Sequence, residues 1–435
     1  MNTAELYKIF TRHPVITTDT RDCPADSIFF ALHGDTFNGN AFAAKALEAG
    51  CAYAVVDEPQ YANADDDRYL VVPDSLKALQ DLARHHRRQM PARIIGITGT
   101  NGKTTTKELI AAVLAEKYNV LYTQGNFNNH IGVPKTLLRL KPEHEVGVIE
   151  MGANHPGEIA CLTGIAEPDC GMITNVGKAH LEGFGSFEGV IKTKGELYDF
   201  LRTKPKSTVF IDNDNPYLRD ISQGLKLVRY GCCPAEDLLI EGQVASSTPL
   251  LQFRWRHSTD AWHDVGTQLI GSYNLTNLLA AACVGLYFGI APEQIDHALS
   301  NYTPGNNRSQ LAVTAHNRLI IDAYNANPTS MNAALTNFEE MDVPKKMAIL
   351  GDMKELGTVS HAEHQKLVDG LRHSTIHTVW LVGEEFGQTE TDFRKFRNVE
   401  EVKQALEKER PEGYHILIKG SHGTRLYTLP EVLYI

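Results

Sequence analysis

Short apolar runs recur along most of the chain, and a stretch with helical periodicity follows nearly all of them. In the middle of the chain these runs are RIIGIT, VLYT, EVGVIE, CGMITNV and STVFID, between residues 93 and 212. Runs of this kind, bounded by turn residues, are typical of parallel strands covered on both faces. The alternation resumes after Pro304-Gly305 with RLIIDAY, MAILGDM, TVWLVGE and HILIKGS. We therefore expect two α/β sheets with ligands at the carboxyl ends of their strands.

The beginning of the chain has a shorter pattern of the same kind. The runs SIFFAL (27–32) and AYAVVD (52–57) are predicted strands, and NAFAAKALEAG (40–50) is a predicted helix that ends at a glycine. The basic, histidine-containing stretch HHRRQMPAR (85–93) then indicates a boundary. This part therefore reads as a small α/β unit of its own.

The predicted fold class is α/β with three domains. Residues 1–88 form a small α/β N-terminal module, residues 89–303 a central phosphate-loop domain with a parallel sheet, and residues 304–435 a Rossmann-like, doubly wound domain. Inside the central part, residues 238–270 change to hairpin-like alternation, and a long apolar helix follows at 276–289. A chain of 435 residues is too long for one ordinary core, which agrees with this division.

Composition and charge narrow the class of protein. The net charge of -11 argues against a nucleic-acid surface, because such surfaces need basic patches. The longest apolar run, at 278–291, is too short to span a bilayer, and the N-terminus carries no apolar signal core. Seven cysteines without a CxxC pair indicate reduced thiols in a cytoplasm. We expect a cytoplasmic protein without a transmembrane segment or a nucleic-acid partner, and a monomer as the default.

The segment TGTNGKTTT at 98–106 predicts a phosphate-binding loop, because a strand precedes it and a helix follows. Glycines let backbone N–H groups approach phosphates, the helix N-terminus favours negative charge, and Lys103 can reach the outer phosphates. Thr104 or Thr105 would offer a hydroxyl to Mg²⁺. The general pattern GxxxxGK[ST] has glycine where this chain has Ile97, so a glycine turn with an incidental lysine is the alternative. The predicted ATP-binding residues of this segment are Thr98, Gly99, Thr100, Asn101, Gly102, Lys103, Thr104 and Thr105.

Glu150 ends the apolar strand EVGVIE, so its carboxylate is expected at the sheet edge near the loop. An acid there can hold Mg²⁺ directly or through water, whereas an isolated strand-end glutamate is usually solvated. His180 follows the strand CGMITNV in a similar position. Its chemistry alone does not select it, because Mg²⁺ prefers oxygen ligands and a lone histidine is usually structural.

Motifs spread over nearly the whole chain resemble the Mur ligase family, which includes folylpolyglutamate synthase. Besides TGTNGKTTT they are GNFNNHIGVP (125–134), IEMGANHPGEI (149–159), TNVGKAHLEGFGS (174–186), KTKGELYD (192–199), GSYNLTNLLAA (271–281), NNRS (306–309), DAYNANP (322–328), LGDMKELG (350–357) and KGSHGTR (419–425). Within the family they resemble the subfamily that adds D-alanyl-D-alanine to UDP-N-acetylmuramoyl-tripeptide. The resemblance implies these two small-molecule substrates, with ATP and two Mg²⁺ ions (or Mn²⁺) as cofactors.

The resemblance also implies the metal ligands, which are Thr104, Glu150, His180 and one lysine of KTKGELYD. In related ligases that lysine is carbamylated and so becomes an anionic oxygen ligand. Residues two apart do not share a helix face, so only one of the two lysines should point into the site. Alignment on the following GELYD selects Lys194, with Lys192 as the second choice and an exposed helix lysine as the alternative.

The remaining nucleotide residues come from later segments. The family uses the segment with Asn274 and Asn277 for the adenine, although asparagines are also common helix caps. Arg308 would reach the ATP phosphates when the third domain closes; a surface arginine is the alternative. Asp322 matches a position that holds the ribose hydroxyls or waters of the phosphate site. Tyr324, Asn325 and Asn327 line the same loop, where Asn327-Pro328 is also a turn signal.

The substrate residues are implied by resemblance alone. DTRDCPADSIFFALHGDTFNGNAF resembles a uridine-diphosphate module, and Arg21 on its chemistry could equally be a surface residue. Lys419, Gly420 and Ser421 match the family's KGS near the incoming dipeptide, but many relatives continue with Arg or Lys where this chain has His422-Gly423. The predicted substrate residues are Thr20, Arg21, Phe29, Ala31, Leu32, Asn38, Gly39, Asn126, Asn128, Asn129, Lys419 and Ser421.

The expected reaction passes the γ-phosphoryl of ATP to a carboxylate, and an amine then attacks the acyl phosphate. Lys103, Lys194, His180 and Arg308 are the predicted catalytic residues. The nearest rival is the sister ligase that adds the third peptide residue, whose diaminopimelate form carries a DNPR motif in its last domain. Here Asp214-Asn215-Pro216 is followed by Tyr217 and lies in the central segment. Folylpolyglutamate synthase lacks the uridine-type module, and a regulatory nucleotide-binding protein is the rival from another class.

Overall fold

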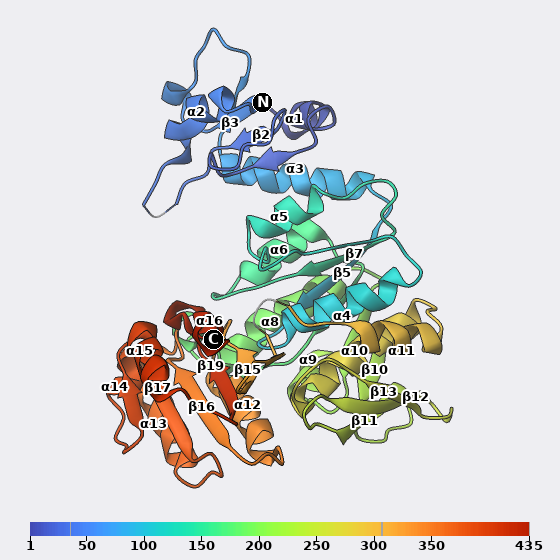
Figure 1. Ribbon diagram of the computed structural model, residues 1–435. Coiled ribbons are helices and arrows are strands. Elements are labelled where there is room, and N and C mark those ends of the chain that lie inside the picture. Colours follow the sequence, from blue (N-terminus) through green and yellow to red (C-terminus); the bar gives the residue numbers. More distant parts are fainter. Residues whose placement is uncertain (35, 306–307, 435) are drawn as a thin grey trace.

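The computed structural model describes residues 1–34, 36–305 and 308–434, and its strands form three separate sheets. The N-terminal unit stands at the top of Figure 1, above the central unit, and the C-terminal unit lies below and beside the central one. The predicted α/β class with three domains is confirmed. Among the described residues, the helices are all too short or too polar for a bilayer crossing.

The N-terminal unit is a small parallel sheet in the order β1-β2-β3-β4, covered by helices. The predicted strands at 27–32 and 52–57 are β2 and β3, and the predicted helix at 40–50 is the 3₁₀ turn η1 (Gly39–Phe42) and α2. The bounds are α1 Thr3–Phe10, β1 Ile16–Thr17, β2 Ile28–Phe30, α2 Ala43–Glu48, β3 Tyr53–Val56, β4 Tyr69–Val71 and α3 Ser75–Gln89.

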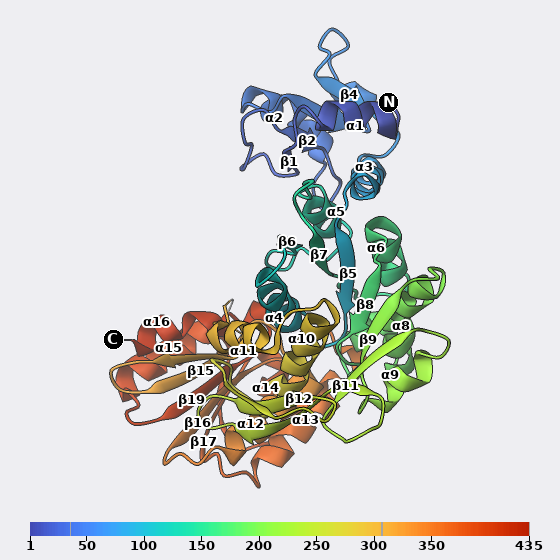
Figure 2. The same cartoon turned by 90° about the vertical axis from the view of Figure 1, so that its right-hand side faces the viewer.

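Helix α3 connects the N-terminal unit to the central unit. Asp74 caps its start by accepting a hydrogen bond from the Lys77 N–H. Near its end, His86 Nε2 lies 2.8 Å from the Leu140 carbonyl oxygen, and Arg87 donates to Asp169 at 2.7 Å. Figure 2 shows α3 between the N-terminal sheet and the helices of the central unit. The basic stretch that indicated a boundary is thus the last turn of this helix and the start of the next strand.

The central unit is built on a nine-stranded sheet in the order β13-β12-β11-β10-β9-β8-β5-β7-β6. The five predicted strands between 93 and 212 all exist and pair in parallel. The strand bounds are β5 Arg93–Thr98, β6 Val120–Tyr122, β7 Val146–Glu150, β8 Cys170–Ile173, β9 Thr208–Asp212, β10 Leu227–Gly231, β11 Leu238–Ser246, β12 Gln252–His257 and β13 His263–Gly266.

The rest of the central unit covers this sheet. The predicted hairpin is the antiparallel set β11–β12–β13, and the predicted apolar helix is α10, which is buried over most of its length. The helix bounds are α4 Lys103–Ala115, α5 Gly132–Leu137, α6 Glu158–Ala166, α7 Leu181–Phe184, α8 Phe187–Arg202, α9 Pro216–Ile221, α10 Leu275–Tyr287 and α11 Pro292–Asn301.

The C-terminal unit is a six-stranded sheet in the order β14-β15-β19-β16-β17-β18, parallel except for the edge strand β14. The strands are β14 Gln310–Val313, β15 Arg318–Asp322, β16 Lys346–Gly351, β17 Thr378–Val382, β18 Arg394–Phe396 and β19 His415–Lys419. The helices are α12 Pro328–Glu340, α13 Ser360–Leu371, α14 Glu384–Gly387, α15 Val399–Glu409 and α16 Pro430–Leu433.

The central and C-terminal units meet at loops that follow their parallel strands. The loop after β5 contacts the start of α12, where the amide of Asn327 donates to the Asn101 side chain at 2.7 Å. The loop after β8 contacts the same region, where the Lys178 N–H donates to Thr329 at 3.2 Å. The carboxyl ends of the two sheets are therefore next to each other, which is the place where open α/β sheets bind ligands.

Candidate active site

The loop between β5 and α4 has the backbone that close approach to phosphates requires. Gly99 has φ +145°, and a Cβ there would lie 2.0 Å from the Thr174 hydroxyl oxygen. Gly102 has φ +76°, and its Cβ would lie 2.6 Å from Asn277 Oδ1. Side chains are excluded at both positions, so the backbone N–H groups at the start of α4 stay accessible. Ile97, the departure from the general pattern, is a buried residue of β5.

Lys103 is the first residue of α4, and its side chain folds over the loop. Its Nζ donates to the carbonyl oxygens of Gly99 at 2.8 Å and Thr100 at 3.1 Å. Burial lowers the pKa of Lys103, nearby Glu150 raises it, and Arg308 lowers it further. Carbonyl oxygens are weak partners for a buried amine, so a phosphate group is a stronger acceptor for the same nitrogen.

Glu150 ends β7 next to this loop and is 1% exposed. Its Oε1 accepts hydrogen bonds from the Thr104 hydroxyl at 3.2 Å and from the Asn128 amide at 2.8 Å. Its Oε2 has no hydrogen-bond partner among the described residues. A buried carboxylate with one oxygen left over, beside a threonine hydroxyl, fits the oxygen donor set that Mg²⁺ prefers.

Lys107, one turn after Lys103, was not singled out from the sequence. The residue is fully buried, and its Nζ lies 3.6 Å from Glu108 Oε1 and 3.8 Å from Glu150 Oε2. No hydrogen bond reaches this Nζ within the described part of the chain. A charge on the buried face of the helix after the phosphate loop is the local signal that indicates such a residue.

Lys194 and Lys192 differ sharply in their surroundings, although both belong to α8. Lys192 is exposed, whereas Lys194 is 2% exposed and donates to the Ala153 carbonyl oxygen at 3.2 Å. Burial, followed by the charge of Lys103, lowers the pKa of Lys194 to about 7. Of the two lysines, Lys194 is the one that points inward.

His180 lies in the loop after β8, directly before α7. Its ring packs edge-on against Phe184, and the Lys194 amine lies 5.1 Å from the centre of the same Phe184 ring. The Nδ1 atom of His180 also contacts the carboxylate of Glu355, a residue of the C-terminal unit. This pairing is the main cause of the lowered pKa of the Glu355 carboxyl. Glu355 belongs to the LGDMKELG motif but was not among the residues predicted for the site.

Asn274 and Asn277 stand at the start of α10 and are tied into the protein. The Asn277 amide donates to Asn274 Oδ1 at 2.8 Å, and its Oδ1 accepts from the Thr106 hydroxyl at 3.0 Å. The Asn274 amide donates to the Ile270 carbonyl oxygen at 2.8 Å. Asn274 occupies the N-cap position of α10, but neither side chain forms a capping hydrogen bond with this helix. Asn277 lies inside the first turn, against Gly102 of the phosphate loop.

The C-terminal unit contributes a cation and an acid to the same region. The Arg308 guanidinium carbon lies 3.9 Å from the centre of the Tyr324 ring, so the arginine is stacked rather than free on the surface. Asp322 ends β15, and its Oδ2 accepts from Lys419 Nζ at 2.6 Å. Lys419, which was expected near the incoming dipeptide, thus has its amine committed to Asp322. Asn306 and Asn307, in the NNRS motif, lie outside the described residues.

The side chains of Asn327 and Ser421 form hydrogen bonds within the protein, so they are not free to bind a ligand in this conformation. Asn327 caps α12 through Ser330 and faces Asn101 across the junction of the two units. The Ser421 hydroxyl is buried, accepts from the Lys354 N–H at 3.1 Å and does not line the cavity described below. Ser421 therefore holds two loops together in this conformation.

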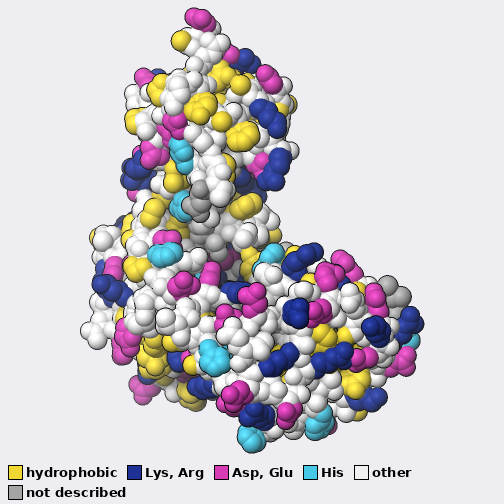
Figure 3. All heavy atoms as spheres, turned by 90° about the vertical axis from the view of Figure 1, so that its left-hand side faces the viewer, with side chains coloured by type: hydrophobic (Ala, Val, Ile, Leu, Met, Phe, Trp, Pro, Cys, Tyr) yellow, Lys and Arg dark blue, Asp and Glu magenta, His cyan; other side chains and the backbone are white. Residues whose placement is uncertain are grey.

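A cavity of about 1330 Å³ runs from the phosphate loop to the N-terminal unit. The surface is hollowed below that unit, on a face where acidic and basic side chains are interspersed (Figure 3). The predicted residues that line the cavity are Thr100, Asn101, Gly102, Lys103, Thr104, Thr105, Asn126, Asn128, Asn129, Glu150, His180, Asn274, Asn277, Arg308, Asp322, Tyr324 and Lys419.

Sequence reasoning missed part of this lining. Leu76 and Gln80 of α3 line it from the N-terminal unit, and His130 and Cys161 line it from the central unit. The Gln80 amide donates to the His130 carbonyl oxygen at 3.2 Å, which closes that end. The amphipathic pattern of α3 indicates a packed face, but not that part of the helix borders a ligand space.

The predicted uridine-side residues lie apart from this cavity. Phe29, Ala31 and Leu32 are buried, and Phe29 and Ala31 belong to the core under α2, so their side chains do not offer a surface to a base. Thr20 is partly exposed next to Arg21, whose exposed guanidinium pairs with Asp19 at 2.7 Å. In this structure Arg21 has the contacts of a surface residue, which was the alternative to a substrate-binding role.

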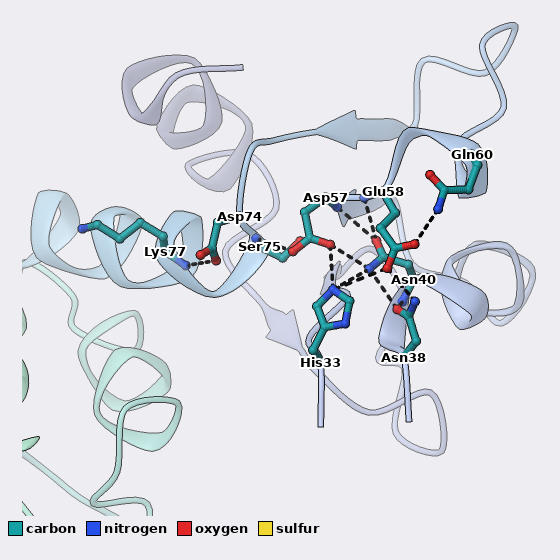
Figure 4. Close-up of polar contacts among 9 residues, drawn as sticks. All are labelled: His33, Asn38, Asn40, Asp57, Glu58, Gln60, Asp74, Ser75 and Lys77. Carbon is teal, nitrogen blue, oxygen red and sulfur yellow. Dashed lines mark hydrogen bonds and ion pairs between the residues drawn. The ribbon is translucent and has the colours of Figure 1, made fainter. Parts of the chain in front are cut away.

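Asn38 belongs to a polar network shown in Figure 4. Its amide donates to Glu58 at 2.6 Å, and its Oδ1 accepts from the Asn40 N–H at 2.9 Å. Asn40 in turn donates to Asp57 at 2.7 Å, and His33 Nε2 lies 3.1 Å from the same carboxylate oxygen. These bonds hold the loop that carries Gly39, whose Cβ would lie 2.4 Å from the Leu32 carbonyl oxygen.

Sequence models of protein families match the chain in three places. The model described as "Mur ligase family, catalytic domain" matches residues 14–87. The "Mur ligase middle domain" matches residues 97–285, and the "Mur ligase, glutamate ligase domain" matches residues 307–422. Each match falls on one of the three sheets.

Curated relatives and solved structures match over almost the full length. The UDP-N-acetylmuramoyl-tripeptide--D-alanyl-D-alanine ligase of Bacillus subtilis (strain 168) is 34% identical, covering 94% of this chain and 91% of the relative. The ligase of the same name from Escherichia coli (strain K12) is 36% identical, covering 85% and 81%. The crystal structure of MurF ligase from Thermotoga maritima in complex with ADP has a TM-score of 0.85 to this chain, with 26% identity and 97% of each chain covered.

Proposed function

This chain belongs to the Mur ligase family, and from that premise we propose that it is an ATP-dependent ligase that joins D-alanyl-D-alanine to UDP-N-acetylmuramoyl-tripeptide. The reaction forms ADP and phosphate and contributes to peptidoglycan precursor synthesis. The two curated relatives that carry this name support the choice of substrates.

The observation that carries the proposal is the junction of three units around one cavity. The phosphate loop lies at one end of this cavity, and the N-terminal unit borders the other. A volume of about 1330 Å³ exceeds the roughly 300–1,000 Å³ of a usual small-molecule site. A ligase must hold ATP and a second, large substrate at the same time, and a cavity of this size beside the phosphate loop supports that requirement.

In the proposed first step, the γ-phosphoryl group of ATP passes to the terminal carboxylate of the tripeptide. Lys103 leaves its two carbonyl partners and binds the outer phosphates, and Arg308 approaches from the C-terminal unit. The backbone N–H groups at the start of α4 bind the remaining phosphate oxygens. The chain uses no side-chain nucleophile in this step.

In the second step the neutral amine of D-alanyl-D-alanine attacks the acyl phosphate and phosphate leaves. The C-terminal unit covers the junction, which keeps water away from the acyl phosphate. Asp322 and its partner Lys419 stand at the carboxyl ends of β15 and β19. We assign Asp322 to nucleotide binding. Lys419 would fix the position of Asp322 through its hydrogen bond to the carboxylate.

Thr104 and Glu150 would hold one Mg²⁺ ion, and His180 together with carbamylated Lys194 would hold a second. Bound Mg²⁺ would supply positive charge to the phosphate oxygens as the group transfers. Glu150 contributes an oxygen without a hydrogen bond among the described residues, and Thr104 contributes its hydroxyl. These roles, and those of Asn274, Asn277, Tyr324 and Asn327 at the nucleotide, are part of the proposal.

Carbamylation of Lys194 has support in its surroundings. The amine is buried, and its hydrogen bond goes to a backbone carbonyl rather than to a carboxylate. A carbamate would turn this buried cation into an oxygen ligand beside His180. The pKa of about 7 means that a large part of the amine is neutral near pH 7, as reaction with CO₂ requires.

The proposed substrate residues of the N-terminal unit act mostly through the backbone. Phe29, Ala31 and Leu32 have buried side chains, so the carboxyl end of β2 and the loop around Gly39 would present main-chain groups to the uridine. Asn126, Asn128 and Asn129 would contact the peptide end, because they line the cavity beside Glu150. All seven cysteines are free, and we propose a monomer that works in a cytoplasm.

Release of ADP in a coupled assay tests this function. Continuous release of ADP over many turnovers should require UDP-N-acetylmuramoyl-tripeptide, D-alanyl-D-alanine, ATP and Mg²⁺ together. Lys103→Met should lower the rate by about 100-fold or more, because charge stabilisation at the transferring group is lost. Lys206→Met, at an exposed lysine of the same unit, is the matched control and should have little effect. No ADP with the complete mixture would refute the proposal.

A further inference from the structure

Glu355 is the one acid of the C-terminal unit whose carboxylate contacts a proposed metal ligand among the described residues. It lies in the loop after β16 and lines the cavity with His180. Its Oε2 pairs with the Nδ1 atom of His180, which is buried. Apart from this contact, the nitrogen has no hydrogen-bond partner among the described residues.

The backbone at this contact has an unusual conformation on both sides. His180 has φ +50° and Glu355 has φ +62°, in the left-handed region that residues with a Cβ rarely adopt. Two such residues facing each other indicate that the surrounding structure imposes the conformation. Strained backbone of this kind concentrates at functional sites, so the pair merits a functional explanation.

The two units also fit closely around the pair. Gly357 has φ +56°, and a Cβ there would lie 3.3 Å from the Cβ of Glu182. The Glu182 N–H donates to the Glu355 carbonyl oxygen at 3.4 Å. Because the backbones of the two loops are in contact next to Glu355, the whole loop must dock on the central unit for Glu355 to reach His180.

We propose that Glu355 is a positioning residue that fixes the proton of the His180 imidazole on Nδ1 and leaves Nε2 free to bind a cation. The inference rests on the proposed function, in which His180 is a metal ligand. A carboxylate on one ring nitrogen sets the tautomer and the ring orientation of a histidine ligand. Because Glu355 and His180 belong to different units, the proton is fixed on Nδ1 only while the C-terminal unit is docked on the central unit.

This contact differs from the other polar links across the same junction. Lys178 pairs with Glu363 at 3.1 Å, and this pair also joins the central and C-terminal units. Glu363 does not line the cavity and does not touch His180. Glu363→Gln therefore weakens the junction without changing the group on the imidazole, and it is the matched control for Glu355→Gln and Glu355→Ala.

The test measures the tautomer of His180 by ¹⁵N NMR of histidine-labelled protein without metal or nucleotide, with the signal assigned through His180→Asn. The wild type should show the Nδ1–H tautomer. Glu355→Ala should shift His180 toward Nε2–H, whereas Glu355→Gln, whose amide oxygen can still accept the proton, should keep Nδ1–H. Glu363→Gln should leave the signal unchanged. A wild-type Nε2–H tautomer, or a His180 signal that Glu355→Ala does not move, overturns the inference.

A second measurement connects the tautomer to the cation. In the ADP-release assay, Glu355→Ala should raise the half-saturating Mg²⁺ concentration by about 10-fold or more, and Glu363→Gln should not. An equal rise in both variants would mean that Glu355 only holds the units together, and would overturn the inference. Failure of the proposed ligase reaction has a different signature, since the tautomer measurement needs neither substrate nor turnover.

Discussion

Lys107 and Glu150 place opposite charges inside the central unit, under the phosphate loop. The lysine nitrogen and Glu150 Oε2 are 3.8 Å apart, and neither has a hydrogen bond among the described residues. Removing one member of such a pair leaves the other as an uncompensated buried charge. The lysine thus has an energetic role even though it does not line the cavity.

The change Lys107→Met tests this interpretation. We expect the free energy of unfolding to fall by about 3 kcal/mol, because Glu150 and Glu108 lose their shared cation. Lys206→Met, at an exposed position, should change it by less than about 0.5 kcal/mol. Urea unfolding of the two variants beside the wild type gives both values. Equal stability of Lys107→Met and wild type would show that the buried charge is not compensated by this lysine.

Asp212, at the end of β9, predicts a pH dependence of stability. Burial raises its pKa from 3.8 to about 6, so between these values the folded protein binds more protons than the unfolded chain. The contribution of Asp212 to the free energy of unfolding is therefore fully present below pH 3.8 and is lost as pH rises through about 6. The asparagine of the Asp212→Asn variant cannot ionise, so this variant does not lose this stability. At pH 8 its free energy of unfolding should exceed that of the wild type by at most about 3 kcal/mol.

Urea unfolding of Asp212→Asn and wild type at pH 4 and pH 8 measures the effect. The difference in free energy of unfolding between variant and wild type should grow from the lower to the higher pH. The variant keeps an oxygen that can accept from the Asp214 N–H, as Asp212 does at 3.0 Å. A difference that is the same at both pH values would contradict the raised pKa.

Residues whose place in the structure follows from a local pattern were predictable from the sequence, and residues whose place depends on distant partners were not. Lys103 follows a glycine loop, and Glu150 ends an apolar strand, so both are visible in a short window. Glu355 and His180 are far apart in the chain and meet only through the docking of two units. No periodicity or spacing indicates that contact.

At the scale of elements, the phosphate loop depends on glycine at one crowded position. Gly99→Ala would put a Cβ 2.0 Å from the Thr174 hydroxyl oxygen, at a φ of +145° that alanine does not tolerate. The loop must shift, and a displacement of about 1 Å at a catalytic group costs about 100-fold in rate. We expect ADP release to fall by at least that factor and ADP to bind more weakly.

Gly164→Ala is the matched control in the same unit. Gly164 lies inside α6, and a Cβ there meets nothing within 4 Å. Alanine should raise the free energy of unfolding by about 0.5–1 kcal/mol through its higher helix propensity. Calorimetric titration with ADP should give wild-type affinity for this variant. Unchanged ADP affinity in Gly99→Ala would show that the loop tolerates the side chain.

The elements themselves followed the hydrophobic pattern where their strands are buried on both faces. The five parallel strands from β5 to β9 and the four main strands of the C-terminal sheet were predicted from apolar runs. The strands that were not predicted, such as β4, β14 and β18, are short or partly exposed, so their side chains form no continuous apolar run. The end of the first unit was not predicted as a helix, because the basic last turn of α3 resembles a linker in sequence.

At the scale of the whole molecule, the sequence predicted three α/β units but not how they face one another. The family matches follow the three sheets, whereas the exact boundaries at 88/89 and 303/304 stay predictions. The cavity arises only when α3, the phosphate loop and the ends of β15 and β19 come together. Such an arrangement depends on contacts between units, which composition and periodicity do not encode.

The central claim is that this cavity forms an amide through an acyl phosphate. The most direct test uses UDP-N-acetylmuramoyl-tripeptide labelled with ¹⁸O in its terminal carboxylate, with ATP and D-alanyl-D-alanine, and mass spectrometry of the phosphate and the peptide product. We expect one ¹⁸O atom in each phosphate released, in step with amide formation, because the carboxylate oxygen leaves with the phosphoryl group. Amide product accompanied by unlabelled phosphate would contradict it.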